Sequence, residues 1–90
     1  MAVFAILSDP SNEKLPEAIQ EQFPSDSLRI RAGQWLVAAS GITAQGLSEQ
    51  LGITDGKNGA AVVITSASYF GRATPSIWEW IKAKLETSNG

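Results

Sequence analysis

The sequence contains no cysteine and no histidine. These absences exclude disulfide bonds, thiol nucleophiles, catalytic histidines and the zinc sites that cysteine and histidine form. A disulfide-stapled secreted miniprotein is therefore excluded as well. Without disulfides, a domain of this size must gain its stability from close packing or from a partner subunit.

Long hydrophobic runs and positive charge are also scarce. Residues 2–7 form a short apolar run with no basic residue before it, whereas a membrane span needs roughly 20 apolar residues. We therefore expect a cytoplasmic protein that does not enter the membrane. The net charge is −2, and phosphate contacts need a clustered basic surface. Nucleic acid is a possible partner that the net charge does not favour.

What the chain does contain is the composition of one globular domain. Ninety residues, 43% of them hydrophobic, fit a single α+β domain spanning residues 1–90. Glycine, proline and hydrophobic periodicity divide the chain into seven segments. Strands are predicted at residues 2–7, 28–32, 34–39 and 60–65, and helices at residues 15–23, at residues 44–51 and from residue 75 onward.

The order of these segments predicts a topology. A β-α-β-β-α-β order with an added C-terminal helix is typical of the ferredoxin-like split βαβ fold. We expect a four-stranded antiparallel sheet in the order 4-1-3-2, with its helices on one face. Residues 2–7 and 60–65 are apolar on both faces, so the opposite sheet face needs a cover. We expect a homodimer formed through this open face; the alternative is a monomer whose C-terminal helix folds across it.

Several short sequence segments resemble those of a known group of proteins. They are Leu7-Ser8-Asp9 at the end of the first strand, Gln34-Trp35-Leu36-Val37, the helical residues Ala44, Leu47 and Leu51, and Trp78, Trp80 and Ile81. Together with the segment order, they resemble small bacterial SinR-like proteins and, more distantly, CRISPR adaptation endonucleases and VapD-type ribonucleases with a ferredoxin-like fold. In the adaptation endonucleases, an Asp at the end of the first strand is the proposed metal ligand across a dimer axis. The resemblance thus implies a dimer and a metal role for Asp9.

Residues 71–76 are a candidate binding site for a small anion or a nucleotide. A helix N-terminus presents unpaired N–H groups that suit an anion. Gly71 allows the backbone to approach a ligand, and Arg72 offers a bidentate contact. Thr74 and Ser76 add hydroxyl donors. The same residues also fit a structural role, in which Gly71 forms a turn and Thr74 caps the helix.

Charged residues supply two further candidate sites. Arg29 and Arg31 alternate along a strand, so we expect both on one face; they would hold a phosphate or a partner's carboxylate, or form the solvated side of an edge strand. Asp9 is the loop carboxylate that we retain as a metal ligand, because Asp26 and Asp55 fit turns. No cofactor is expected, and magnesium at Asp9 is the alternative.

Together these features favour a small binding or interaction module that forms a homodimer through its open sheet face and is not an enzyme. One alternative is a metal-dependent nuclease-like protein that uses Asp9. The other is a small-anion or nucleotide binder at residues 71–76.

Overall fold

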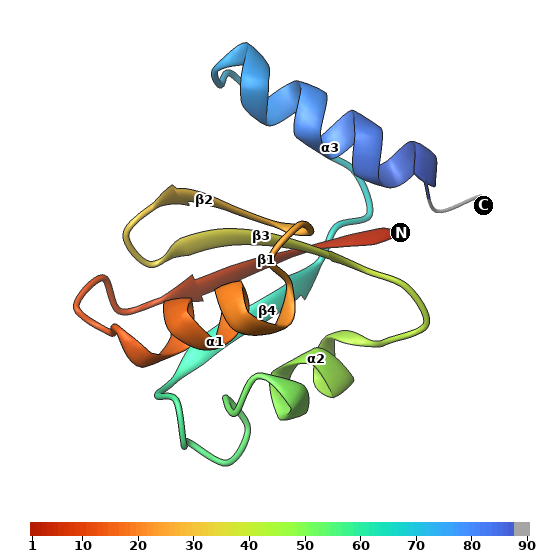
Figure 1. Cartoon of the computed structure of the whole chain (residues 1–90). Coiled ribbons are helices and arrows are strands. Elements are labelled where there is room, and N and C mark those ends of the chain that lie inside the picture. Colours follow the sequence, from red (N-terminus) through yellow and green to blue (C-terminus); the bar gives the residue numbers. More distant parts are fainter. Residues whose placement is uncertain (88–90) are drawn as a thin grey trace.

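Four strands form one antiparallel sheet, and three helices pack around it (Figure 1). The computed structural model describes residues 1–87. In chain order the elements are β1 (Ala2–Ser8), α1 (Lys14–Gln22), β2 (Ser27–Arg31), β3 (Gln34–Ala39), α2 (Ala44–Gln50), β4 (Ala61–Thr65) and α3 (Pro75–Thr87). The strands lie in the order β2-β3-β1-β4. The α+β class and the central positions of β1 and β3 are as predicted.

The main hydrophobic core lies between the sheet and helices α1 and α2. Phe4 of β1 lies opposite Val37 of β3, and two residues further on Ile6 lies opposite Trp35. Because side chains alternate along a strand, these four residues share one face of the sheet. They are buried together with four residues of the helices, namely Leu15, Ile19, Leu47 and Leu51.

Short polar side chains set the starts of the first two helices. The Asn12 side-chain oxygen accepts hydrogen bonds from the backbone N–H groups of Lys14 and Leu15, at 3.0 and 3.3 Å. The Thr43 hydroxyl accepts one from the N–H of Gly46 at 3.0 Å, as its predicted capping role requires. These bonds satisfy N–H groups that have no partner within a helix.

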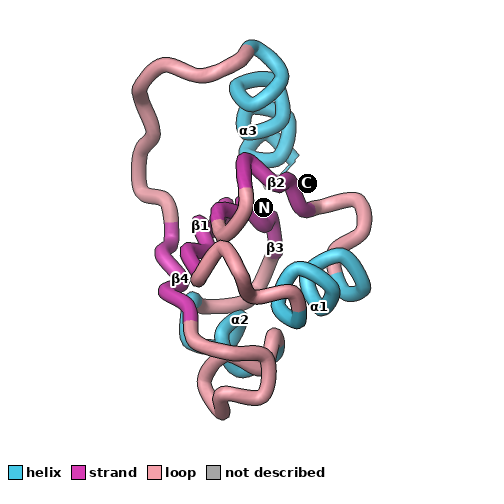
Figure 2. Tube along the Cα trace, turned by 90° about the vertical axis from the view of Figure 1, so that its left-hand side faces the viewer, coloured by secondary structure: helices cyan, strands magenta, loops and turns pink. Residues whose placement is uncertain are grey.

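Helix α3 does not cover the same sheet face as α1 and α2, as predicted for all the helices, but lies across the opposite face, where the alternative prediction placed the C-terminal helix (Figure 1). It lies on the opposite side of the sheet from α1 and α2 (Figure 1), at the end of a long connection that leaves β4 (Figure 2). Val3 and its neighbour Ala38 are buried on this second face, where α3 contacts β1. Ile81 of α3 is buried as well. The apolar second face of β1 and β3 explains this position of α3. A helix that covers this face removes its apolar surface from water.

A charged contact fixes the C-terminal half of α3. The Lys84 ammonium group donates to the Asp26 carboxylate at 2.8 Å and to the Ser25 carbonyl at 3.0 Å. Near the start of the helix, the rings of Tyr69 and Trp78 stack with their centres 5.8 Å apart. Within residues 1–87, no helix has both the length and the apolar character that a membrane crossing requires.

Candidate functional site

Helix α3 leaves part of the second sheet face open. Leu7 of β1 and Val62 and Ile64 of β4 are 46%, 57% and 48% exposed. Leu7 lies directly opposite Val62, and Ile64 lies two residues further along β4. All three therefore lie on the face opposite the main core. We call Leu7, Val62 and Ile64 the apolar patch.

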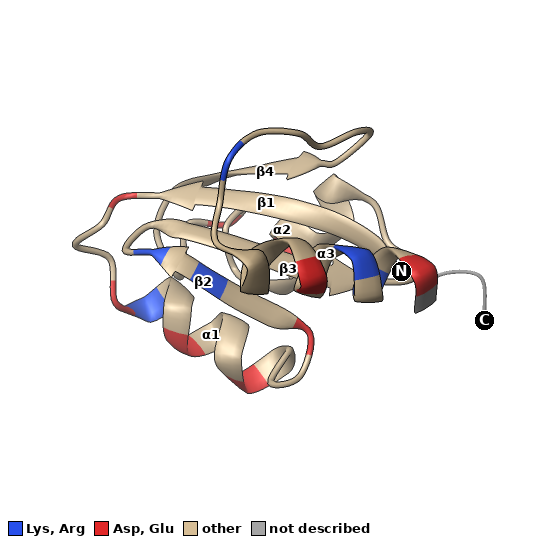
Figure 3. Cartoon of the chain, turned by 90° about the horizontal axis from the view of Figure 1, so that it is seen from above, with Lys and Arg blue, Asp and Glu red and all other residues tan. Residues whose placement is uncertain are grey.

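Two of the three residues of the apolar patch lie on an edge strand that carries no charge. β4 is the outermost strand on its side of the sheet, and neither it nor β1 contains a charged residue (Figure 3). Edge strands in natural proteins are usually protected from pairing by charges, prolines or bulges. The opposite edge strand, β2, has two such devices, a pair of arginines and a bulge. β4 has no charge, no proline and no register shift in its pairing with β1.

The two arginines of β2 do not share a face, so that prediction is wrong. Arg29 pairs with Trp35, but Arg31 pairs with Gln34, because an irregularity between them shifts the register. Trp35 and Gln34 are neighbours on β3 and face opposite sides of the sheet. Arg29 consequently lies on the side of α1 and Arg31 on the other side. The pair cannot grip one phosphate from a common face.

Arg29 instead lines a small cavity beside the start of α1. The cavity has a volume of about 270 Å³, and Trp35, Glu13 and Asn12 also line it. Within the described residues, the indole N–H of Trp35 is buried without a hydrogen-bond partner. The cavity thus combines one cationic side chain, one carboxylate and an aromatic ring. Trp35 lies beside Arg29, its partner in the pairing of β2 with β3.

Asp9 is part of a turn. Its carboxylate accepts hydrogen bonds from the backbone N–H and the hydroxyl of Ser11, at 2.8 and 2.7 Å. These bonds lower the pKa of the Asp9 carboxyl below its ordinary value, with the backbone bond contributing most. In the part of the chain that the structure describes, no three acidic side chains gather in a way that would hold a metal ion.

Replacing Asp9 with asparagine should remove a pH-dependent part of the stability. Because the folded state lowers the pKa of this carboxyl, its contribution is complete above the unfolded value of about 3.9. It is lost as the pH falls through the lower folded value. The difference in urea midpoint between the natural protein and Asp9→Asn should therefore be largest at neutral pH and shrink towards pH 3. A difference that is constant with pH would contradict this role.

Residues 71–76 form an exposed surface segment. Gly71 has a φ of +147°, with open space around the position of a Cβ atom. The side chains of Arg72, Thr74 and Ser76 are exposed. The hydroxyls of Thr74 and Ser76 lie 3.1 Å apart and bond to each other. Of the four predicted residues, the structure therefore brings Thr74 and Ser76 together at the start of α3.

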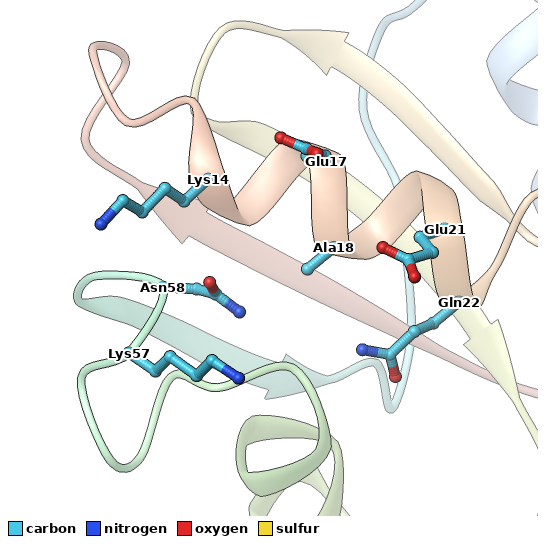
Figure 4. Close-up of a pocket in the computed structure, with 7 residues that line it drawn as sticks. All are labelled: Lys14, Glu17, Ala18, Glu21, Gln22, Lys57 and Asn58. Atoms are coloured by element: carbon cyan, nitrogen blue, oxygen red, sulfur yellow. The ribbon is translucent and has the colours of Figure 1, made fainter.

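A groove lies between α1 and the loop that precedes β4 (Figure 4). It has a volume of about 390 Å³ and a balanced set of charges. Its lining consists of Lys14, Glu17, Ala18, Glu21, Gln22, Lys57 and Asn58. Two lysines, Lys14 and Lys57, and two glutamates, Glu17 and Glu21, supply these charges.

Two asparagines that sequence reasoning missed hold this region together. The Asn58 side chain donates to the Leu51 carbonyl at 2.7 Å, and the Asn12 side chain donates to the Asn58 carbonyl at 2.8 Å. They connect the start of α1, the end of α2 and the loop before β4. The position of Asn58 in a turn rich in glycine was the available signal, because such turns need side chains that bond to the backbone.

Comparisons of the chain with protein-family models, with curated proteins and with solved structures found no match.

Proposed function

We propose that this domain is a self-association module and that two copies meet at the apolar patch. The observation that carries the proposal is the exposure of three large aliphatic side chains, Leu7, Val62 and Ile64, on one surface. Covering apolar surface is favourable by roughly 25 cal/mol for each Å² removed from water. A group of such side chains beside an edge strand is typical of an interaction site, whereas single exposed ones are common on any protein.

A second copy of the chain is the occupant that the charges favour. β4 and the second face of β1 carry no charged residue that a partner would have to neutralise. Such a surface is complementary to itself, and a two-fold axis brings the same patch from each copy together. Helix α3 covers the neighbouring area around Val3 and Ala38, so the surface left for the partner is limited to the β1–β4 half.

The proposal also includes a topology, a likeness to a known group of proteins and a location in the cell. The segment order and the strand order β2-β3-β1-β4 support a ferredoxin-like split βαβ arrangement, with α3 as an addition on the second face. The likeness to small bacterial SinR-like proteins and a cytoplasmic location are part of the same proposal. The exposed aliphatic patch supports a role in binding rather than in catalysis.

The oligomeric state tests the proposal directly. Size-exclusion chromatography with light scattering, run from micromolar to several hundred micromolar protein, should show the mass rising from that of one 9.6 kDa chain towards twice that value. The rise should persist in high salt, because screening weakens charged contacts and not apolar ones. A mass of one chain at every concentration would refute self-association.

A further inference from the structure

We infer that the second copy pairs along the outer edge of β4, so that two four-stranded sheets join into one continuous sheet. This inference rests on the proposed self-association and specifies its geometry. Among the described residues, β4 pairs with β1 on one side and with no strand on the other. An unpaired strand edge presents a row of N–H and C=O groups to a second strand.

The backbone hydrogen bonds show which residues of β4 face outward. Ser66 donates its N–H to the Val3 carbonyl at 2.9 Å, which makes this a hydrogen-bonded pair of the antiparallel ladder. Hydrogen-bonded and non-hydrogen-bonded pairs alternate along such a ladder. Since Phe4 pairs with Thr65 and Ile6 with Val63, the outward groups belong to Ala61, Val63 and Thr65.

This edge is complementary to itself. In an antiparallel arrangement about a two-fold axis at Val63, this residue meets its own copy, and Ala61 meets the partner's Thr65. The outward-facing groups of the two copies then lie opposite one another along the whole strand. On the open face, Val62 lies opposite the partner's Ile64, so these side chains cover part of one another where the two apolar patches meet. No like charges are brought together, because β4 carries none.

The position of α3 favours edge pairing over face-to-face packing. Packed sheets lie about 10 Å apart, and a helix is itself roughly 10–12 Å across. Since α3 lies on the second face, it occupies the space that a facing sheet would need. The outer edge of β4 pairs with no strand of the described residues. The β2 edge is less suitable, because Arg29, Arg31 and the register shift between them protect it.

Introduced cysteines test this geometry, and the absence of natural cysteines makes the result specific. In the inferred register, Val62 and the partner's Ile64 form a non-hydrogen-bonded pair, with Cα atoms about 4.5 Å apart. That distance lies within the range of a disulfide. The double variant Val62→Cys/Ile64→Cys should therefore form a covalent dimer under mild oxidation, and peptide mapping should find residue 62 linked to residue 64.

The two single variants are the matched controls. In the same register, residue 62 lies diagonally from its own copy, at about 7–8 Å, too far for a disulfide without backbone movement. Each single variant should therefore cross-link far less than the double variant. Equal cross-linking by the singles, or none by the double variant while light scattering shows a dimer, overturns edge pairing and leaves self-association standing. If the natural protein is monomeric at all concentrations, both proposals are overturned.

Discussion

Replacing Ile64 with lysine should convert the self-associating protein into a monomer while the domain stays folded. The Ile64 side chain is 48% exposed in one copy, so a lysine there can keep its ammonium group in water. In the paired state the same side chain lies against the partner's Val62. Symmetry places the change at two positions of the interface, so two apolar contacts between Ile64 and the partner's Val62 are lost. We expect the dissociation constant to rise at least about 100-fold, which corresponds to roughly 2.8 kcal/mol.

The matched control for this variant is Ile30→Lys. Ile30 is 41% exposed and lies on β2, the edge strand at the other side of the sheet. Its replacement should leave the dissociation constant unchanged within about threefold, on the order of 0.6 kcal/mol. Sedimentation velocity measures the association, and circular dichroism checks that both variants are folded. Equal weakening by the two lysines would point to a general charge effect and away from the apolar patch.

Replacing Gly33 with alanine should destabilise the fold more than the same replacement at any of the turn glycines later in the chain. A Cβ atom at Gly33 would lie 2.5 Å from the Ser8 carbonyl oxygen and 3.2 Å from the Pro10 nitrogen. Both neighbours are backbone atoms, so no side chain can rotate away. The Gly33 carbonyl also accepts the Ser8 N–H at 2.9 Å, which holds the end of β1 to the hairpin.

The expected loss combines two physical costs. The backbone of Gly33 has a φ of +78°, where an alanine costs roughly 1–2 kcal/mol. The forced contact adds about 1–3 kcal/mol. The sum is a large fraction of the roughly 5–15 kcal/mol that stabilises a typical domain. Urea unfolding followed by tryptophan fluorescence should show a much lower midpoint for Gly33→Ala.

The control is Gly56→Ala. Gly56 has nearly the same φ, +76°, but no atom lies within 4 Å of its Cβ position. This variant should lose only the backbone cost of roughly 1–2 kcal/mol. Equal losses at the two glycines would show that the contact with Ser8 and Pro10 does not matter.

Much of the fold was predictable because its determinants are local. The apolar runs at residues 2–7 and 60–65 predicted two strands with both faces in need of cover, and β1 and β4 carry the apolar patch. Gly33, between the predicted strands 28–32 and 34–39, has the positive φ that a tight turn between them requires. The central positions of β1 and β3 followed from the segment order.

The remainder depends on contacts between distant segments. The alternation of Arg29 and Arg31 predicted one shared face, but the register shift between them separates the two side chains. The apolar stripe of α3 is the same whichever sheet face it covers, so its pattern alone could not place the helix. The ties from Asn12 and Asn58 join segments that sequence spacing does not bring together.

The connection between β4 and α3 has a consequence for competition at the second sheet face. Residues 66–74 tether α3 beside the area around Val3 and Ala38. A tether gives the attached segment a higher effective concentration at its site than a weak free competitor reaches. A free partner that needs the same area must exceed this advantage before it can displace the helix. Weak competitors are therefore restricted to the strip along β4 that the tethered helix does not reach.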